Sequence, residues 1–190
     1  ITVRLVGSEM CIRDSLSLHS GFEKYLTEAP GAFEIPFIIE KYIKKYDGVI
    51  ALGGGSSMDL AKAVALGVTH DGDLIDYTAG MGGAAKIGTV APLVAVPTTS
   101  GTGSEVSSGA VIIMNNGEKL ILASRELVPK TAICDPTLTI GLPPRLTSAT
   151  GMDAMTHCIE ALLSPQVNPP AEAVACDGIK RGIKAVSYTH

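Results

Sequence analysis

The stretch Val49–Gly67, VIALGGGSSMDLAKAVALG, decides how the first part of the chain folds. Its opening run 49–52 is apolar throughout, which is typical of a strand buried on both faces of a parallel sheet. Residues 58–66 then have a helical pattern, and Gly67 is where we expect that helix to end. A strand, a glycine loop and a helix in this order predict an α/β unit with a parallel sheet.

Further segments predict the elements around this unit. The apolar run 93–96 predicts a second buried strand, which ends at Pro97. The turn sequence Asn115-Asn116-Gly117 between two apolar runs predicts a hairpin. Asn168 as N-cap, with Pro169 in the first turn, predicts the start of a helix. The expected elements are helices at 35–46, 58–66, 151–164 and from 169 towards 185, and strands at 49–52, 93–96, 110–114, 120–123 and 131–134.

Composition limits the class of protein. The chain has 190 residues, of which 46% are hydrophobic, and a net charge of −4, which argues against intrinsic disorder. Lysine and arginine form no cluster, so neither a nucleic-acid nor a membrane partner is indicated. The four cysteines are scattered without a C-x-x-C motif and are typical of buried intracellular thiols. We therefore expect a cytoplasmic protein.

The domain organisation is predicted from a change of composition. Pro143-Pro144 predicts a stiff connector, and helical patterns follow it. We expect a partial α/β domain over 16–146 and the start of a helical domain over 147–190. Segments 1–15 and 186–190 resemble translated adapter sequence, and our hypothesis is that they are not native. The chain is expected to be a fragment of a longer protein.

The glycine loop Gly53–Gly55 is a candidate phosphate site. Glycines let a ligand approach the backbone closely, and a helix N-terminus offers free N–H groups and a positive dipole end. Ser56 and Asp59 have the spacing of a capping box, so an ordinary capped turn is the alternative. The G-x-G-x-x-G fingerprint fails because Met58 stands where it needs glycine.

A second polar loop, Thr98–Ser104, follows the second predicted strand. Ligands of open α/β sheets bind beyond the carboxyl ends of the strands, where both loops are expected. The hydroxyls of Thr98 and Thr99 could bind phosphate or ribose, although serine, threonine and glycine also simply form turns. Together the two loops favour nucleotide binding.

Asp153 and His157 are a candidate pair of metal ligands. At a spacing of four they lie on one face of the predicted helix, so both could reach one ion. A solvated helical face with a weak Asp–His pair is the plainer interpretation. Two ligands do not complete a site, and further ligands would have to come from sequence outside this chain.

Three motifs together resemble a known family. They are Gly53–Lys62 (GGGSSMDLAK), Pro97–Val106 (PTTSGTGSEV) and Thr150–Glu160 (TGMDAMTHCIE). In this order they are similar to the iron-containing (metal-dependent, group III) alcohol dehydrogenases. The resemblance covers about Phe22 to Ala185.

The resemblance implies an N-terminal Rossmann-like dinucleotide-binding domain, partial here, and the first helices of an all-α metal-binding domain. It implies Fe²⁺ or Zn²⁺ on Asp153 and His157, which act in catalysis through the metal, and NAD or NADP as cofactor. The two further histidine ligands of such enzymes would lie beyond this chain. The implied cofactor-binding residues are Gly54, Gly55, Ser56, Asp59, Thr98, Thr99, Ser107, Lys119 and Leu146.

The implied activity is reversible hydride transfer between a small alcohol and its aldehyde or ketone. The complete protein is expected to be a homo-oligomer, and the fragment alone is expected to be inactive. Alternatives are an enzyme on the same scaffold, similar to glycerol dehydrogenase or dehydroquinate synthase, and a non-catalytic nucleotide-binding module.

Overall fold

The computed structural model describes residues 4–6, 48–113 and 119–189, with side chains over 48–113 and 119–185. Contacts divide the chain into two compact units. The first comprises Ile1–Thr98 and Ser104–Asp135, and the second comprises Thr99–Gly103 and Pro136–His190. The helix expected over 35–46 and the hairpin turn at 115–117 lie outside the described residues.

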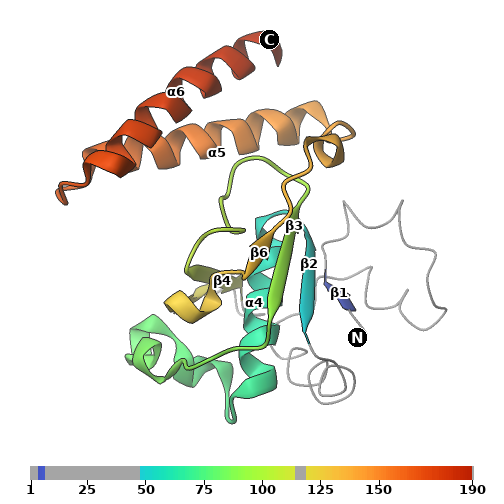
Figure 1. The fold of residues 1–190 in the computed structure, drawn as a ribbon, viewed down its shortest axis with the longest axis vertical. Coiled ribbons are helices and arrows are strands. Elements are labelled where there is room, and N and C mark those ends of the chain that lie inside the picture. The colour runs from blue at the N-terminus through green and yellow to red at the C-terminus, as the bar shows by residue number, and fades with distance from the viewer. Residues whose placement is uncertain (1–3, 7–47, 114–118, 190) are drawn as a thin grey trace. The chain divides into compact units, whose positions relative to one another are not determined.

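A four-stranded parallel sheet organises the first unit (Figure 1). Its strands stand in the order β1 (Arg4–Val6), β2 (Val49–Gly53), β3 (Leu93–Pro97) and β6 (Thr131–Ala132). β2 and β3 pair from Val49 opposite Leu93 to Gly53 opposite Pro97. Their carboxyl ends therefore finish side by side, and both polar loops begin at one edge of the sheet. The parallel sheet with helices confirms the α/β class.

The last strand is shorter than expected. β6 pairs with β3 only over Thr131 and Ala132, although Ile133 still donates its N–H to the Ala95 carbonyl at 2.8 Å. Ile133 and Cys134 are exposed. Cys176 is exposed as well, so the expectation of buried thiols was wrong for these two cysteines. The strand predicted over 131–134 was therefore too long, because the chain leaves the sheet after the hydrogen bond of the Ile133 N–H.

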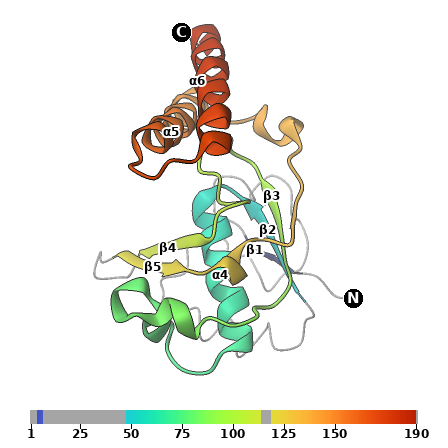
Figure 2. The ribbon, with the colours of Figure 1, turned by 60° about the vertical axis from the view of Figure 1, so that its left-hand side comes forward.

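Helix α4 (Gly55–Thr69) packs on the sheet and supplies much of the core (Figure 2). It begins three residues before the predicted start and runs through Gly67, so the predicted end was wrong. The helix ends at Thr69 instead, and His70 is its C-cap, whose N–H donates to the Leu66 carbonyl at 3.0 Å. Gly67 is absent from the described glycines of positive φ, so it does not act as a left-handed cap.

Strands β4 (Gly109–Ile113) and β5 (Lys119–Ala123) form an antiparallel ribbon in the first unit. Ala110, Ile112 and Leu122 are buried, whereas Val111 and Ile113 are exposed, which is the alternation of a ribbon with one covered face. β4 packs against α4. Both predicted hairpin strands are therefore confirmed.

Short 3₁₀ turns connect these elements. In the first unit they are η2 (Leu74–Tyr77), η3 (Ala79–Met81), η4 (Gly83–Lys86) and η5 (Arg125–Leu127). In the second unit η6 (Pro136–Thr139) precedes the helices.

Two long helices, α5 (Pro144–Leu163) and α6 (Pro169–Thr189), pack on each other in the second unit. The expected stiff connector at Pro143-Pro144 was wrong, because Pro143 is the N-cap of α5 and Pro144 lies in its first turn. Proline is tolerated there because an N–H at the first helical position would have no partner within the helix, so its absence costs no hydrogen bond. α6 starts at Pro169 as predicted, with Ala171 N–H donating to Asn168 Oδ1 at 3.3 Å. None of the helices in the described part of the chain is long and apolar enough to cross a membrane.

Candidate functional site

The glycine loop leads from a buried strand directly into helix α4. Gly53 has a φ of 144°, a conformation that other residues rarely adopt. Gly54 is the N-cap and, having no side chain, makes no capping hydrogen bond. The predicted capping box of Ser56 with Asp59 does not form, because the helix already begins at Gly55. The first-turn N–H groups therefore lack a side-chain cap, as an anion site requires.

Two buried hydroxyls of the first unit follow the carboxyl ends of β2 and β3. Ser57 is 2% exposed and Thr98 is 6% exposed, yet neither Oγ has a hydrogen-bond partner among the described residues. Thr98 follows β3, and its N–H donates to the Gly53 carbonyl at 2.9 Å, which brings the two loops together. An unsatisfied buried hydroxyl costs about 1–3 kcal/mol. A polar ligand would remove this cost.

The sequence pattern did not point to Ser57. Ser57 is the third residue of α4 only because the helix begins at Gly55, whereas the sequence pattern placed the helix start at Met58 and left Ser57 outside it. Thr99 Oγ1 is likewise unpartnered within the described residues, and Thr99 belongs to the second unit.

Asp59 is used by the protein itself. Its Oδ1 accepts a hydrogen bond of 2.6 Å from Ser104 Oγ, and its Oδ2 accepts one of 2.9 Å from the Val111 N–H. These bonds tie the loop after β3 and strand β4 to helix α4. The expected place of Asp59 near a cofactor ribose stays a prediction.

Lys62 is a buried cation to which the sequence pattern gave no site role. Its side chain is fully enclosed, and Nζ donates to Ser107 O at 3.0 Å, Ser107 Oγ at 3.0 Å and Gly109 O at 2.8 Å. Burial lowers the pKa of Lys62 to about 8, although the charges of Asp59 and Glu105 oppose that shift. The available signal was a lysine within the apolar run 61–66, Ala-Lys-Ala-Val-Ala-Leu.

The remaining predicted cofactor residues occupy different places. Gly54 is buried, Gly55 is half-buried and Ser56 is exposed at the start of α4. Lys119 is exposed at the first position of β5. Leu146 is half-buried in the first turn of α5, in the second unit. The structure therefore brings the glycine loop and Thr98 together within the first unit, while the cofactor roles of all these residues stay predictions.

The predicted metal pair lies on α5. Asp153 Oδ1 and His157 Nε2 are 3.8 Å apart, and their side chains are 43% and 50% exposed. A carboxylate oxygen and an imidazole nitrogen suit Fe²⁺ and Zn²⁺. No group of three or more metal-ligating side chains occurs within the described residues. The pair thus fits a metal as part of a ligand set and does not form a complete site.

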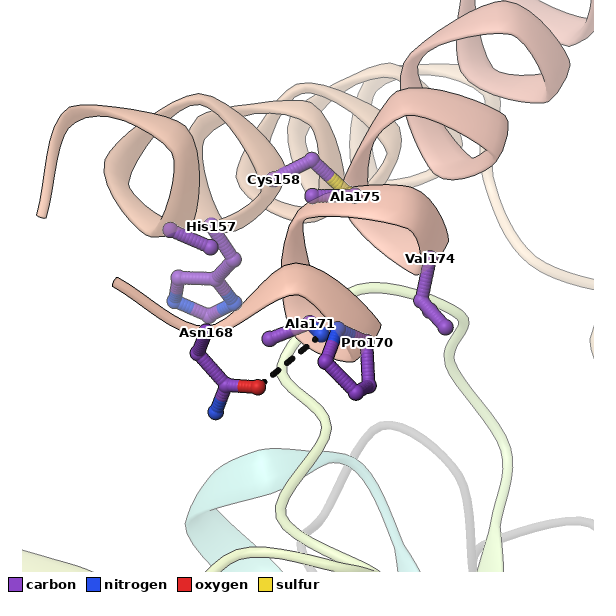
Figure 3. A pocket seen from close by; sticks show the side chains of 8 residues that line it. His157, Cys158, Asn168, Pro170, Ala171, Val174 and Ala175 are labelled. Carbon is purple, nitrogen blue, oxygen red and sulfur yellow. Dashed lines mark hydrogen bonds between the residues drawn. The ribbon is translucent and has the colours of Figure 1, made fainter. Parts of the chain in front are cut away.

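A mainly apolar groove of about 500 Å³ lies between α5 and α6, and His157 and Cys158 contribute to its wall (Figure 3). The first turn of α6 forms the opposite side, where Asn168 caps the helix through Ala171. Val174 and Ala175 continue that side along α6. One of the two predicted metal ligands therefore borders an apolar surface.

Comparison with known proteins identifies the family. The family described as iron-containing alcohol dehydrogenase matches residues 35–136. The 4-hydroxybutyrate dehydrogenase of Cupriavidus necator is 58% identical over 137 residues, which are 72% of this chain and 36% of that protein. The 1,3-propanediol dehydrogenase of Klebsiella pneumoniae is 40% identical over 135 residues, which are 70% of this chain and 34% of that protein.

Solved structures agree with this result. A sulfoacetaldehyde reductase from Bifidobacterium kashiwanohense in complex with NAD⁺ matches with a TM-score of 0.76 and 36% identity, over 85% of this chain and 44% of that one. An NADH-dependent butanol dehydrogenase from Thermotoga maritima matches with a TM-score of 0.72 and 32% identity, over 82% and 39%. The chain spans about a third of the length of the curated relatives named above. It belongs to the iron-containing alcohol dehydrogenase family.

Proposed function

We propose that the protein is an NAD-dependent alcohol dehydrogenase that requires iron. It would oxidise a small alcohol to an aldehyde or ketone and run in reverse as a reductase. The observation that carries the proposal is the pair of unpartnered buried hydroxyls, Ser57 and Thr98, beside the uncapped N-terminus of α4. Family membership and the relatives named for NAD and NADH support it.

The glycine loop would bind the cofactor pyrophosphate. The first-turn N–H groups of α4 would donate to phosphate oxygens, and the absence of side chains at Gly54 and Gly55 would allow close approach. Thr98 and Ser57 would then gain the partners that they lack. The carboxylate of Asp59 could accept a ribose hydroxyl as well as its two present donors, because each of its oxygens has two lone pairs.

The reaction itself is hydride transfer. The carbinol carbon would give a hydride to C4 of the nicotinamide, and the hydroxyl proton would leave to solvent, so that the alcohol is oxidised and NAD⁺ becomes NADH. Asp153 and His157 would supply two ligands of the metal, and the rest would come from outside these 190 residues. The metal would act as a Lewis acid on the substrate oxygen.

The test uses the protein expressed from its complete reading frame and loaded anaerobically with Fe²⁺. NADH absorbance should rise with NAD⁺ and at least one of a panel of small primary and secondary alcohols, and should fall with the matching aldehydes. No change across both panels would contradict the proposal. The 190-residue chain alone should show no turnover, and iron-dependent turnover by it would contradict the assignment of only part of the metal site.

Metal analysis tests the ligand pair separately. Asp153→Ala and His157→Ala in the complete protein should each lower the ratio of bound iron to protein well below that of the wild type. Glu160→Ala is the matched control, because Glu160 is an exposed carboxylate on the same helix. Equal iron content in all three variants would contradict the assignment of Asp153 and His157.

A further inference from the structure

We infer that Lys62 is a positioning residue that fixes the hydroxyl of Ser107 as a hydrogen-bond acceptor, so that the cofactor reaches Ser107 with an O–H or N–H donor and not with a phosphate oxygen. This inference rests on the proposed function, because it concerns how the protein binds the same cofactor through hydrogen bonds. It concerns residues of the first unit alone.

The ammonium of Lys62 has no hydrogen left for a ligand. It carries three N–H donors, and the structure gives it three acceptors at hydrogen-bond distance. These are Ser107 O at 3.0 Å, Ser107 Oγ at 3.0 Å and Gly109 O at 2.8 Å. Because the side chain is also fully buried, Lys62 acts on a ligand only through the segment that it holds.

The hydroxyl of Ser107 is oriented by the same group. It accepts from Lys62 Nζ and donates its single hydrogen to Gly109 O at 3.2 Å. A hydroxyl has one hydrogen and two lone pairs, so one lone pair remains. Ser107 is half-buried and so not closed off from solvent, and the cofactor would reach this remaining lone pair. The partner must be a donor, because the single hydrogen of the Ser107 hydroxyl is already donated to Gly109 O.

The surrounding contacts keep this arrangement in place. Asp59 anchors the same segment on both sides of Ser107, through Ser104 Oγ and the Val111 N–H. Asp59 and Lys62 stand three residues apart, on one face of α4. The segment 104–111 is therefore held to α4 before and after Ser107, which leaves its hydroxyl little freedom to move.

Nucleotide cofactors offer two kinds of donor. The ribose hydroxyls are one, and the carboxamide N–H of the nicotinamide ring is the other. Either group could donate to the Ser107 hydroxyl in the same geometry, and cofactor analogues distinguish the two. A deoxyribose analogue lacks one hydroxyl donor, whereas the 3-acetylpyridine analogue replaces the carboxamide by a group without N–H.

The experiment measures dissociation constants of NADH and these reduced analogues with the protein from its complete reading frame. In the wild type, the analogue that lacks the donor should bind about tenfold more weakly than NADH, the size expected for one hydrogen bond. In Ser107→Ala that difference between NADH and the analogue should vanish. In Lys62→Met, which frees the hydroxyl to rotate, the difference should shrink while far-ultraviolet circular dichroism stays native.

The controls and the contrary outcomes are specific. Ser108→Ala and Lys130→Met, at exposed positions, should leave the discrimination at the wild-type value. If Lys62→Met does not fold, the comparison of wild type with Ser107→Ala decides. Wild-type protein that binds NADH and every analogue equally would overturn the inference alone, and wild-type protein that binds no NADH would overturn the proposed function with it.

Discussion

Gly101 lies so close to Thr150 that a Cβ on Gly101 would overlap the carbonyl oxygen of Thr150. Both residues belong to the second unit, so the loop 99–103 packs on the backbone of helix α5 at this point. The sequence predicts that the hydroxyls of this loop bind a ligand. At Gly101, close approach between two backbone segments already requires glycine.

Gly101→Ala should therefore destabilise the protein by about 1–3 kcal/mol, the usual cost of overpacking against atoms that cannot move aside. Gly103→Ala is the matched comparison. A Cβ there meets nothing within 4 Å, but φ is +65°, so only about 1 kcal/mol of backbone strain is expected. Urea unfolding of both variants checks the order, and an equal or smaller loss for Gly101→Ala would contradict the contact.

Helices α5 and α6 come together at two glycines. A Cβ at Gly178 would lie 2.6 Å from Cys158 Sγ, and one at Gly182 would lie 2.7 Å from Met155 Cγ. Gly178→Ala should cost about 1–2 kcal/mol, because the clash outweighs the helix propensity that alanine adds. Adding Cys158→Ala should restore much of this loss, since it removes the sulfur. Thermal unfolding of the single and double variants tests this, and a double variant no more stable than Gly178→Ala would refute it.

Lys62 predicts how stability changes at alkaline pH. Its folded pKa of about 8 lies below the ordinary value of 10.5, so between these pH values the unfolded chain binds more protons than the folded one. The Lys62 contribution to the free energy of unfolding should therefore rise from pH 8 to pH 10.5, by up to about 3 kcal/mol. Below pH 8 this contribution is absent.

The measurement is urea unfolding of wild type and Lys62→Met at several pH values. The difference between them isolates Lys62, because the other titrating groups are common to both proteins. It should shift in favour of the wild type as pH rises through 8. A difference that does not change with pH would show that the pKa of Lys62 is not lowered by burial.

Local pattern was enough to predict strands β2 and β3 and the helix starting at Pro169, because apolar runs and capping residues act over a few positions. It did not predict strand β1, at Arg4–Val6. It predicted the ends of α4 and α5 less well. Gly67 suits a helix end by itself, yet the helix continues to Thr69, and the N–H of the C-cap His70 donates to the Leu66 carbonyl. Pro143-Pro144 suits a connector, yet it starts α5.

The site shows the same limit. The pair Asp153 and His157 could be found from a spacing of four on one helix. The bonds from Lys62 to Ser107 join residues 45 positions apart, and no local pattern encodes such a contact. Ser57 and Thr98 are similar, since burial without a partner is a property of the packed structure and not of the sequence.

Ser57 and Thr98 predict opposite effects on stability and on cofactor affinity. Ser57→Ala and Thr98→Val remove hydroxyls that are buried without a partner among the described residues, so each ligand-free variant should be as stable as the wild type or up to about 1 kcal/mol more stable. Each should nevertheless bind NADH about tenfold more weakly, because the hydroxyl that the cofactor would satisfy is gone. Ser148→Ala, which removes an exposed hydroxyl bonded to the Arg145 carbonyl, should leave both quantities near the wild-type values. Thermal unfolding without ligand and titration with NADH give the two quantities, and a variant that loses stability and keeps its affinity would show that these hydroxyls serve packing and not the cofactor.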